Sequence, residues 1–449
     1  MPELIDLAEA VTRHADDRAG EEVEAYVSRG RETSIRVFEG EVEQLSSADS
    51  AGIGVRVVRD GKQGFAWVGA LDEAAAREAL TEARDNVSHA TFDEHAGLAR
   101  PDGVRAAALD LWREELAGFP TQSKVALALE LERQVRAGDS RIRQVVSSDY
   151  ADAIGESAIA TSTGISESTR RTTCYLFVYA IAGDSDDTQT GFGYSVGRSA
   201  DDLDVGKASA DAVDRATRLL GAKKPHSSRL TVVLDQRVTA TLLGIIASTL
   251  SGEEVSKGRS LFADRLGEEV GNGQLTLVDD PTDSSAFGAT PVDGEGLATR
   301  RNELISGGKL MGYLYDTHAG RVARTNSTGS AVRGGYRTTP GVGARAISLL
   351  PGELTQSEII SAVGDGLLVQ SVSGVHSGVN PVSGDFSVGA EGLMIRNGAL
   401  AEPVREMTIA STIQRMLLHV RHVGSDLDWL PGSSAGLTLA IDDVSLGGE

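Results

Sequence analysis

The sequence is poor in cysteine and in aromatic residues. Its 449 residues include one cysteine, Cys174, so no disulfide can form within the chain, and a disulfide-stapled secreted scaffold is excluded. Because Cys174 lies in a strand-like apolar run (172–179), we expect a buried small side chain rather than a nucleophile. Aromatic residues make up only 4% of the chain and hydrophobic residues 40%, so the core must be mostly aliphatic and rich in alanine.

Positive charge is also scarce, since 43 lysines and arginines face 65 aspartates and glutamates, for a net charge of −22. This balance argues against direct contact with nucleic acid or with an anionic membrane surface. The first residues lack a basic segment followed by an apolar one, so they do not resemble a signal peptide. The longest apolar stretch, about 239–250, is shorter than the roughly 20 residues that span a membrane. We therefore expect a cytoplasmic protein.

Hydrophobic periodicity in the first half predicts a helix, a strand meander and a second helix. The helices are expected at 4–14 and 71–87, with Asp72 helping to start the second, and Asp60-Gly61 is a hairpin signal. The strand-like runs are 22–27, 33–38, 42–45, 52–58 and 64–68.

After a Gly- and Pro-rich loop the same order recurs. Helices are expected at 121–135 and about 202–220, with strand-like runs at 142–148, 156–161, 173–181 and 191–196. We interpret this recurrence as an internal duplication of 1–95 and 121–222, with chance similarity as the alternative.

A polar linker at 222–228 predicts a boundary between an N-terminal domain, 1–222, and a C-terminal domain, 229–449. The second domain is expected to be mostly β with one apolar core helix, at 237–250. Its other elements are strands at 230–234, 275–278, 299–305, 309–315 and 437–441 and helices at 355–363 and 408–420. The predicted fold class is therefore α+β.

The Gly-rich stretch 374–410 stands out within the second domain. It predicts strands at 386–390 and 392–395, a hairpin turn at Asn397-Gly398, and an end at Pro403. So many small residues suggest that another backbone comes close, either a neighbouring strand or a bound peptide. A purely structural hairpin is the simpler interpretation.

Local signatures of metal and nucleophilic sites are absent. The eight histidines form no H-E-x-x-H pattern and no Cys/His cluster. His419 and His422 would share a face if their segment were helical, and a solvated or capping pair is the alternative. Residues 432–436 match G-x-S-x-G, but Pro431 precedes and a strand follows, so Ser434 does not fit a nucleophile elbow.

Four arginines gather in or near a Gly-rich loop in this acidic chain: Arg321, Arg324, Arg333 and Arg337. Guanidinium groups with glycines between them suit a carboxylate or a phosphate. The alternative is a surface loop that balances local acid.

Several segments of the chain carry a family resemblance. They are the run 379–398, which contains Asn-Pro-Val-Ser-Gly-Asp-Phe, together with Tyr313-Leu-Tyr-Asp and Asn326-Ser-Thr-Gly. These motifs resemble the TldD/PmbA family, and more closely its PmbA branch, also called TldE. The resemblance extends over essentially the whole chain, including the closing Asp443-Val-Ser-Leu-Gly-Gly.

The resemblance implies a metallopeptidase family whose catalytic TldD subunit carries H-E-x-x-x-H on the helix after the linker. There, two histidines and a C-terminal cysteine hold the metal, and the glutamate would activate its water. In this chain Gly244, Ile245 and Thr249 stand in place of the first histidine, the glutamate and the second histidine, and the stretch 430–436 contains no cysteine. No catalytic residue and no metal ligand therefore carries over.

The resemblance thus implies a non-catalytic TldE/PmbA-type subunit with no cofactor of its own. Zinc would lie in a TldD-type partner subunit, and the pair would degrade or process unfolded peptides. Within the Gly-rich stretch we expect peptide contacts from His376, Asn380, Ser383 and Asp385. The alternatives are a metal-free homodimer that binds peptides or a small ligand, and a hydrolase with an unrecognised site, perhaps near His419 and His422.

Overall fold

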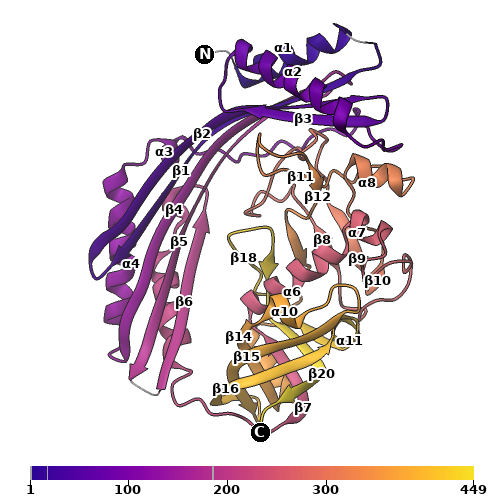
Figure 1. Ribbon diagram of the computed structural model, residues 1–449. Coiled ribbons are helices and arrows are strands. Elements are labelled where there is room, and N and C mark those ends of the chain that lie inside the picture. The colour runs from indigo at the N-terminus through magenta and orange to yellow at the C-terminus, as the bar shows by residue number, and fades with distance from the viewer. Residues whose placement is uncertain (1–2, 18, 185–186) are drawn as a thin grey trace.

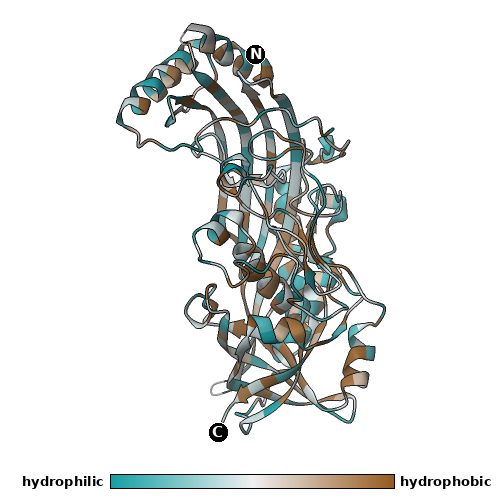
Figure 2. Cartoon of the chain, turned by 90° about the vertical axis from the view of Figure 1, so that its right-hand side faces the viewer, coloured by the Kyte–Doolittle hydropathy of each residue, from teal (hydrophilic) through white to brown (hydrophobic). Residues whose placement is uncertain are grey.

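The computed structural model describes residues 3–17, 19–184 and 187–449. The chain is elongated, with its N-terminal helices at one end and its C-terminus at the other (Figures 1 and 2). A long, curved antiparallel sheet lies beside a C-terminal domain that contains a β-barrel, which confirms the predicted α+β class. Along the long strands, hydrophilic and hydrophobic residues alternate (Figure 2), as expected where the two faces of a sheet differ. Among the described helices, none combines the length and the apolar character needed to cross a membrane.

The long sheet has the strand order β3-β2-β1-β4-β5-β6. Its strands are β1 (Glu22–Phe38), β2 (Glu41–Arg59), β3 (Lys62–Val68), β4 (Ile142–Thr161), β5 (Ser166–Asp184) and β6 (Asp187–Gly197). The prediction of separate short strands was wrong for β1, β2 and β4, each of which joins two predicted runs. Polar residues such as those at 28–32 interrupt the hydrophobic alternation, but β2 and β4 pair with them on both sides. The hairpin at Asp60-Gly61 is confirmed, with φ of 53° and 69°.

Helices cover one face of this sheet. They are α1 (Leu4–Thr12), η1 (Arg13–Asp17), α2 (Glu73–His89), α3 (Glu114–Ala117), α4 (Thr121–Gly138), η2 (Ala200–Asp202) and α5 (Val205–Thr217). Asp72 caps α2 as predicted, because its side chain accepts a hydrogen bond from Ala75 N. Cys174 is buried under α4 and α5, and burial raises the pKa of its thiol to about 12, which fits a packing role.

The order helix, three-stranded meander, helix occurs twice, and the pairing of β1 with β4 joins the two meanders. Whether the two units arose by duplication stays a prediction, as does the domain boundary at residue 222.

The C-terminal domain is built on the strand order β16-β15-β14-β7-β20-β17, and pairing of β16 with β20 closes the barrel. Its strands are β7 (Ser228–Leu234), β8 (Leu277–Asp279), β9 (Asn302–Ser306), β10 (Lys309–Leu310), β11 (Ala331–Val332), β12 (Gly341–Val342), β13 (Ile347–Leu349), β14 (Gly366–Ser373), β15 (Asp385–Arg396), β16 (Ala399–Thr412), β17 (Val420–Val423), β18 (Asp428–Trp429), β19 (Ala435–Gly436) and β20 (Leu439–Gly447). Its helices are α6 (Gln236–Thr249), α7 (Gly252–Ser256), α8 (Thr317–Val322), α9 (Gln356–Val363), α10 (Val375–Gly378) and α11 (Ile413–Leu418).

The Gly-rich stretch differs from its prediction in several ways. The two predicted strands are one, β15, and β16 continues through Pro403 to Thr412. Pro403 is tolerated because it lies where the ladder between β15 and β16 is irregular. The helix predicted at 408–420 is therefore wrong, apart from the short α11. The strand predicted at 309–315 is likewise reduced to β10.

The hairpin turn at Asn397-Gly398 is confirmed, with φ of 51° and 76°. The glycines of β15 admit a neighbouring strand. A Cβ on Gly392 would lie 1.8 Å from the carbonyl oxygen of Leu368 in β14. The close backbone predicted for this stretch, either a neighbouring strand or a bound peptide, is at Gly392 the neighbouring strand β14.

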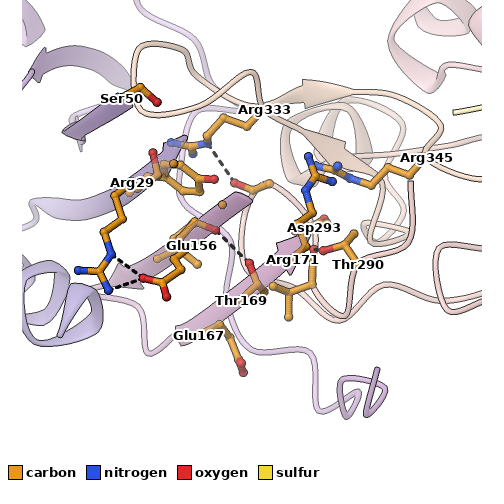
Figure 3. A pocket seen from close by; sticks show the side chains of 18 residues that line it. Arg29, Ser50, Glu156, Glu167, Thr169, Arg171, Thr290, Asp293, Arg333 and Arg345 are labelled. Carbon is orange, nitrogen blue, oxygen red and sulfur yellow. Dashed lines mark hydrogen bonds and ion pairs between the residues drawn. The ribbon is translucent and has the colours of Figure 1, made fainter. Parts of the chain in front are cut away.

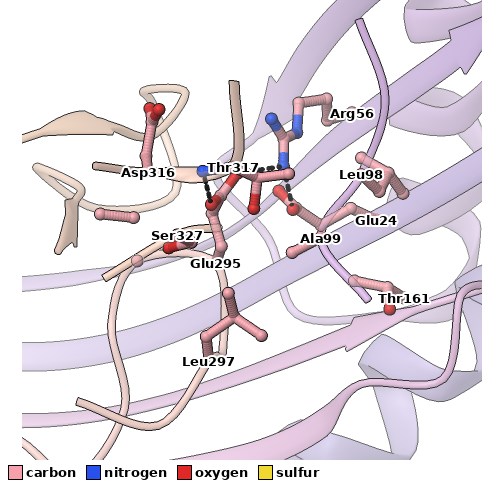
Figure 4. Close-up of polar contacts among 12 residues, drawn as sticks. Glu24, Arg56, Leu98, Ala99, Thr161, Glu295, Leu297, Asp316, Thr317 and Ser327 are labelled. Carbon is pink, nitrogen blue, oxygen red and sulfur yellow. Dashed lines mark hydrogen bonds and ion pairs between the residues drawn. The ribbon is translucent and has the colours of Figure 1, made fainter. Parts of the chain in front are cut away.

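A buried cluster of charges joins the long sheet to the C-terminal domain (Figure 4). The Glu24 carboxylate, on β1, accepts a 2.5 Å hydrogen bond from Arg56 and a second one from Arg333. Arg56 also lies 3.6 Å from Glu295, which accepts a hydrogen bond from Thr317 N. Burial by itself would raise the pKa of Glu24, but the charges of Arg333 and Arg56 outweigh it and the pKa lies below its usual value.

Candidate functional site

One face of helix α6 is not covered by the C-terminal core, and this exposed side is called its open face. The Asp235 side chain starts the helix by accepting a hydrogen bond from Arg237 N at 3.1 Å. One face then packs into the C-terminal core through Val238, Leu242, Leu243 and Ile246. Gly244 and Ser248 are exposed, and because they are four residues apart they share a face.

The loop 430–434 lies against this open face. A Cβ on Gly244 would meet Ser434 Oγ at 3.6 Å, so the fold brings these two positions together. Strand β19 follows Ser434 directly, which confirms that the segment lacks the strand–turn–helix geometry of a nucleophile elbow. Thr249 lies on the opposite, buried side of α6, where its hydroxyl donates to the carbonyl of Ile246.

Zinc does not fit this position. Structural and catalytic zinc sites use thiolate, imidazole or carboxylate ligands, and Gly244, Ile245, Thr249 and Ser434 provide none of these. In the part of the chain that the structure describes, no three His, Cys, Asp or Glu side chains are grouped so that they could hold a metal ion.

A groove separates the 430–434 loop from the long sheet. It contains a cavity of about 500 Å³, lined by Tyr175 and Phe177 of β5 on one side and by Pro431 on the other. The ring of Phe177 stacks on Phe192 of β6, with centroids 6.5 Å apart. The guanidinium of Arg237, in the first turn of α6, lies 4.0 Å from the centre of the Phe192 ring. Aromatic side chains, scarce in the whole chain, thus line the surface that faces α6.

Sequence reasoning missed this aromatic face. The signal was the alternation Tyr175-Leu-Phe177-Val-Tyr179, which places three aromatic rings on one side of a strand. Helices α4 and α5 cover the opposite side of β5, so the aromatic side is left facing α6. This packing between distant elements could not be read from the sequence.

The four residues predicted to contact peptide lie in the exposed segment between β14 and the start of β15. Three of them form one turn: Asn380 Oδ1 accepts hydrogen bonds from Val382 N and Ser383 N, and Ser383 Oγ donates to Asp385 at 2.7 Å. His376 lies apart from this turn, on α10. The loop is exposed, as a binding loop must be, but the polar groups of the turn already hold its own backbone. Peptide contact by these residues stays a prediction.

The two C-terminal histidines do not share a helix. His419 directly follows α11, with Nδ1 3.7 Å from Asp443 Oδ2, whereas His422 lies in β17. Burial, together with the charge of Arg421, lowers the pKa of His422. The premise of a shared helix face was therefore wrong, because α11 ends at Leu418.

The four arginines predicted as an anion site do not converge. Arg333 binds the chain's own Glu24, and Arg321 donates to the carbonyl of Leu98 at 2.7 Å. Arg337 lies 5.0 Å from the centre of the Trp67 ring, and Arg324 is an exposed turn residue with φ of 56°. Three of the four thus attach the loop to the N-terminal half.

Three family models match this chain. They are the models of PmbA/TldA metallopeptidase domain 1, at residues 23–87, of the central domain, at 114–220, and of the C-terminal domain, at 227–448.

Individual relatives match over nearly the full length. The metalloprotease PmbA of Escherichia coli O157:H7 is 26% identical, over 99% of this chain and 96% of that protein. A metalloprotease PmbA homolog of Haemophilus influenzae is 27% identical, over 96% of this chain and 93% of that protein. The crystal structure of TldE from Thermococcus kodakarensis has a TM-score of 0.91 at 21% identity, covers 98% of this chain and 100% of that one, and shows the same fold.

Proposed function

Because the chain belongs to the TldD/PmbA metallopeptidase family, we propose that it is the non-catalytic, PmbA/TldE-type subunit of a two-subunit peptidase. In this proposal a TldD-type partner supplies the zinc and the H-E-x-x-x-H helix. The pair degrades or processes unfolded peptides, and this chain provides part of the surface that holds them.

The contact between α6 and the 430–434 loop carries the proposal. These are the two segments that the family resemblance connects with metal binding, and the fold sets Gly244 opposite Ser434. The two histidines and the glutamate of the family motif are replaced here by a glycine, a threonine and an isoleucine, and the 430–434 loop contains no cysteine. A geometry without ligands at this position supports a subunit that depends on a partner for its chemistry.

The groove supports a peptide as substrate. Aromatic side chains bind varied residues through apolar contact, without demanding one sequence. Strand β6 pairs only with β5 among the described strands, so its outer edge is free to take an extended chain. The loop residues His376, Asn380, Ser383 and Asp385 are proposed as further contacts.

Co-expression tests the subunit assignment. The chain is produced together with an H-E-x-x-x-H homologue from the same genome, and the copurified material is assayed for zinc and for cleavage of an unfolded peptide. We expect one zinc per pair and activity that needs both chains. A chain that alone binds stoichiometric zinc and cleaves peptide would overturn the proposal.

The groove is tested in the same reconstituted pair. Phe177→Ala is expected to raise KM for an unfolded peptide several-fold, since one aromatic side-chain contact contributes about 1 kcal/mol, while the zinc content stays unchanged. Phe92→Ala, at an exposed position outside the groove lining, is the matched control. Equal KM values for the two variants would exclude the groove as the peptide surface.

A further inference from the structure

A second cavity, of about 200 Å³, lies between the long sheet and the C-terminal domain (Figure 3). Its floor is formed by one face of β1, β4 and β5. Its other wall comes from the loop 290–294 and from Arg333 and Arg345. A molecule bound there would therefore touch both halves of the chain.

Glycines leave the floor of this cavity open. Gly30 of β1 pairs with Gly155 of β4, which in turn pairs with Arg171 of β5. A Cβ on Gly155 would meet nothing within 4 Å. The space above Gly155 is thus unfilled, and Arg171 lines the cavity beside it.

Four arginines line the cavity, and two of them have no carboxylate partner. Arg29 pairs with Glu156, and Arg333 pairs with Glu24. Among the described residues, Arg171 and Arg345 form no ion pair and no side-chain hydrogen bond. Figure 3 shows their guanidinium groups pointing toward each other.

The position of Arg345 is held by its backbone. The buried carboxylate of Asp279 accepts hydrogen bonds from Arg345 N at 2.9 Å and from Ala346 N at 2.7 Å. Burial, with the neighbouring charge of Arg171, lowers the pKa of Arg345, although the charges of Asp293 and Asp279 act in the opposite direction. The fold therefore keeps two like charges close together in a partly desolvated place, which costs free energy unless an anion lies between them.

Unsatisfied donors in the same cavity point to a ligand. Arg345 Nε and Arg333 Nη1 are buried and have no hydrogen-bond partner. Buried N–H groups are nearly always satisfied by protein, water or a bound group. The acids that line the cavity do not satisfy them: Asp293 accepts from three backbone N–H groups, and Glu167 lies apart from the arginine pair.

We propose that Arg171 and Arg345 form a carboxylate-binding site, which takes the carboxylate of a peptide between the sheet and the C-terminal domain. A carboxylate matches two guanidinium forks in charge and in planar geometry. The anion site follows from the cavity itself. The choice of a peptide as its source, by its C-terminus or by an acidic side chain, rests on the proposed function.

Calorimetric titration of the purified chain alone tests the site with three short peptides. The first is N-acetyl-trialanine with a free C-terminal carboxylate, the second is its C-terminal amide, and the third is an amide with one glutamate in place of an alanine. We expect binding of the first or the third peptide, which identifies the source of the carboxylate, and no binding of the second. Binding of all three alike, or of none, would overturn the proposal.

Variants assign the binding to the arginine pair. Arg171→Gln and Arg345→Gln should each weaken binding about tenfold or more, the scale of one charge-assisted hydrogen bond. Gly155→Val should block the cavity. Arg170→Gln is the matched control, because Arg170 points to the other face, where it stacks on Trp112.

The stability of the free variants separates binding from structure. Because the pair repels itself when empty, Arg345→Gln should keep or raise the thermal midpoint of the chain. A lowered midpoint, or unchanged peptide binding in both arginine variants, would show a structural role and contradict the site. No partner subunit enters this experiment, so its failure is distinguishable from a failure of the subunit assignment.

Discussion

At the scale of single residues, the interior of this protein holds carboxylates under opposite influences. Glu24 is stabilised as an anion by two arginines, whereas Asp279 is not. Asp279 Oδ1 accepts two backbone hydrogen bonds, but Oδ2 is buried without a hydrogen-bond partner in the described structure. Burial raises the pKa of Asp279 to about 6. The same fold therefore makes one carboxylate a stabilising charge and another a costly one.

Asp279→Asn tests this cost. An unfolded aspartate has a pKa of about 3.9, so between about pH 4 and pH 6 the folded state binds the extra proton and stability falls as pH rises. The variant lacks this loss. Its unfolding free energy relative to the unmodified chain should rise by about 2 to 3 kcal/mol from pH 4 to pH 7.5.

Urea unfolding at the two pH values measures this difference. Asp49→Asn, on the exposed part of β2, is the control and should show no such trend. A difference that stays constant with pH would mean that Asp279 titrates as an ordinary aspartate.

At the scale of elements, α6 has a glycine, Gly244, in the middle of its exposed face. Glycine in a helix interior is less favourable than alanine by about 0.5 to 1 kcal/mol. Gly244 lies in open space apart from Ser434, whereas a Cβ on Gly252 in α7 would lie 2.1 Å from the Tyr315 ring. A side chain at position 252 is therefore excluded by lack of space, whereas one at position 244 is not.

Gly244→Ala should raise the unfolding free energy by about 0.5 to 1 kcal/mol, since the helix gains propensity and the new methyl group makes only ordinary contact. Gly252→Ala should lower it by about 1 to 3 kcal/mol through overpacking. Thermal and urea unfolding compare the two variants. If Gly244→Ala also destabilised the chain, Gly244 would be required for packing against the 430–434 loop.

At the scale of the whole molecule, two cores are coupled by the charge cluster of Figure 4. Glu24 belongs to β1 and Arg333 to the loop after β11, so their buried ion pair spans the boundary between the sheet and the C-terminal domain. Breaking a buried pair by removing one partner is costly, because the other charge stays buried.

Glu24→Gln should lower the unfolding free energy by about 3 to 5 kcal/mol, because it leaves Arg333 without its carboxylate and Arg56 with only Glu295, 3.6 Å away. Glu32→Gln, on an exposed position of the same strand, should change it by less than about 0.5 kcal/mol. Denaturant unfolding followed by tryptophan fluorescence measures both. Equal effects would show that the cluster does not hold the two halves together.

Local signals in the sequence were sufficient for much of the secondary structure. Asp60-Gly61 and Asn397-Gly398 marked their hairpins because only residues that tolerate positive φ suit such turns. The apolar run after the linker marked α6 as a core helix. Strand lengths were underestimated, since polar residues in the middle of β1 and β2 hide a continuity that depends on pairing with neighbouring strands.

What the sequence by itself determined is the identity of the groups available for chemistry. The segments that resemble metal-binding ones carry no metal ligand, whatever the fold. What only the tertiary structure decided is which distant residues meet: Gly244 with Ser434, the β5 aromatic residues with the 430–434 loop, and Arg171 with Arg345. The physical reason is that periodicity records which face of an element is buried, whereas the packing of the long sheet against the C-terminal domain sets what each exposed face meets.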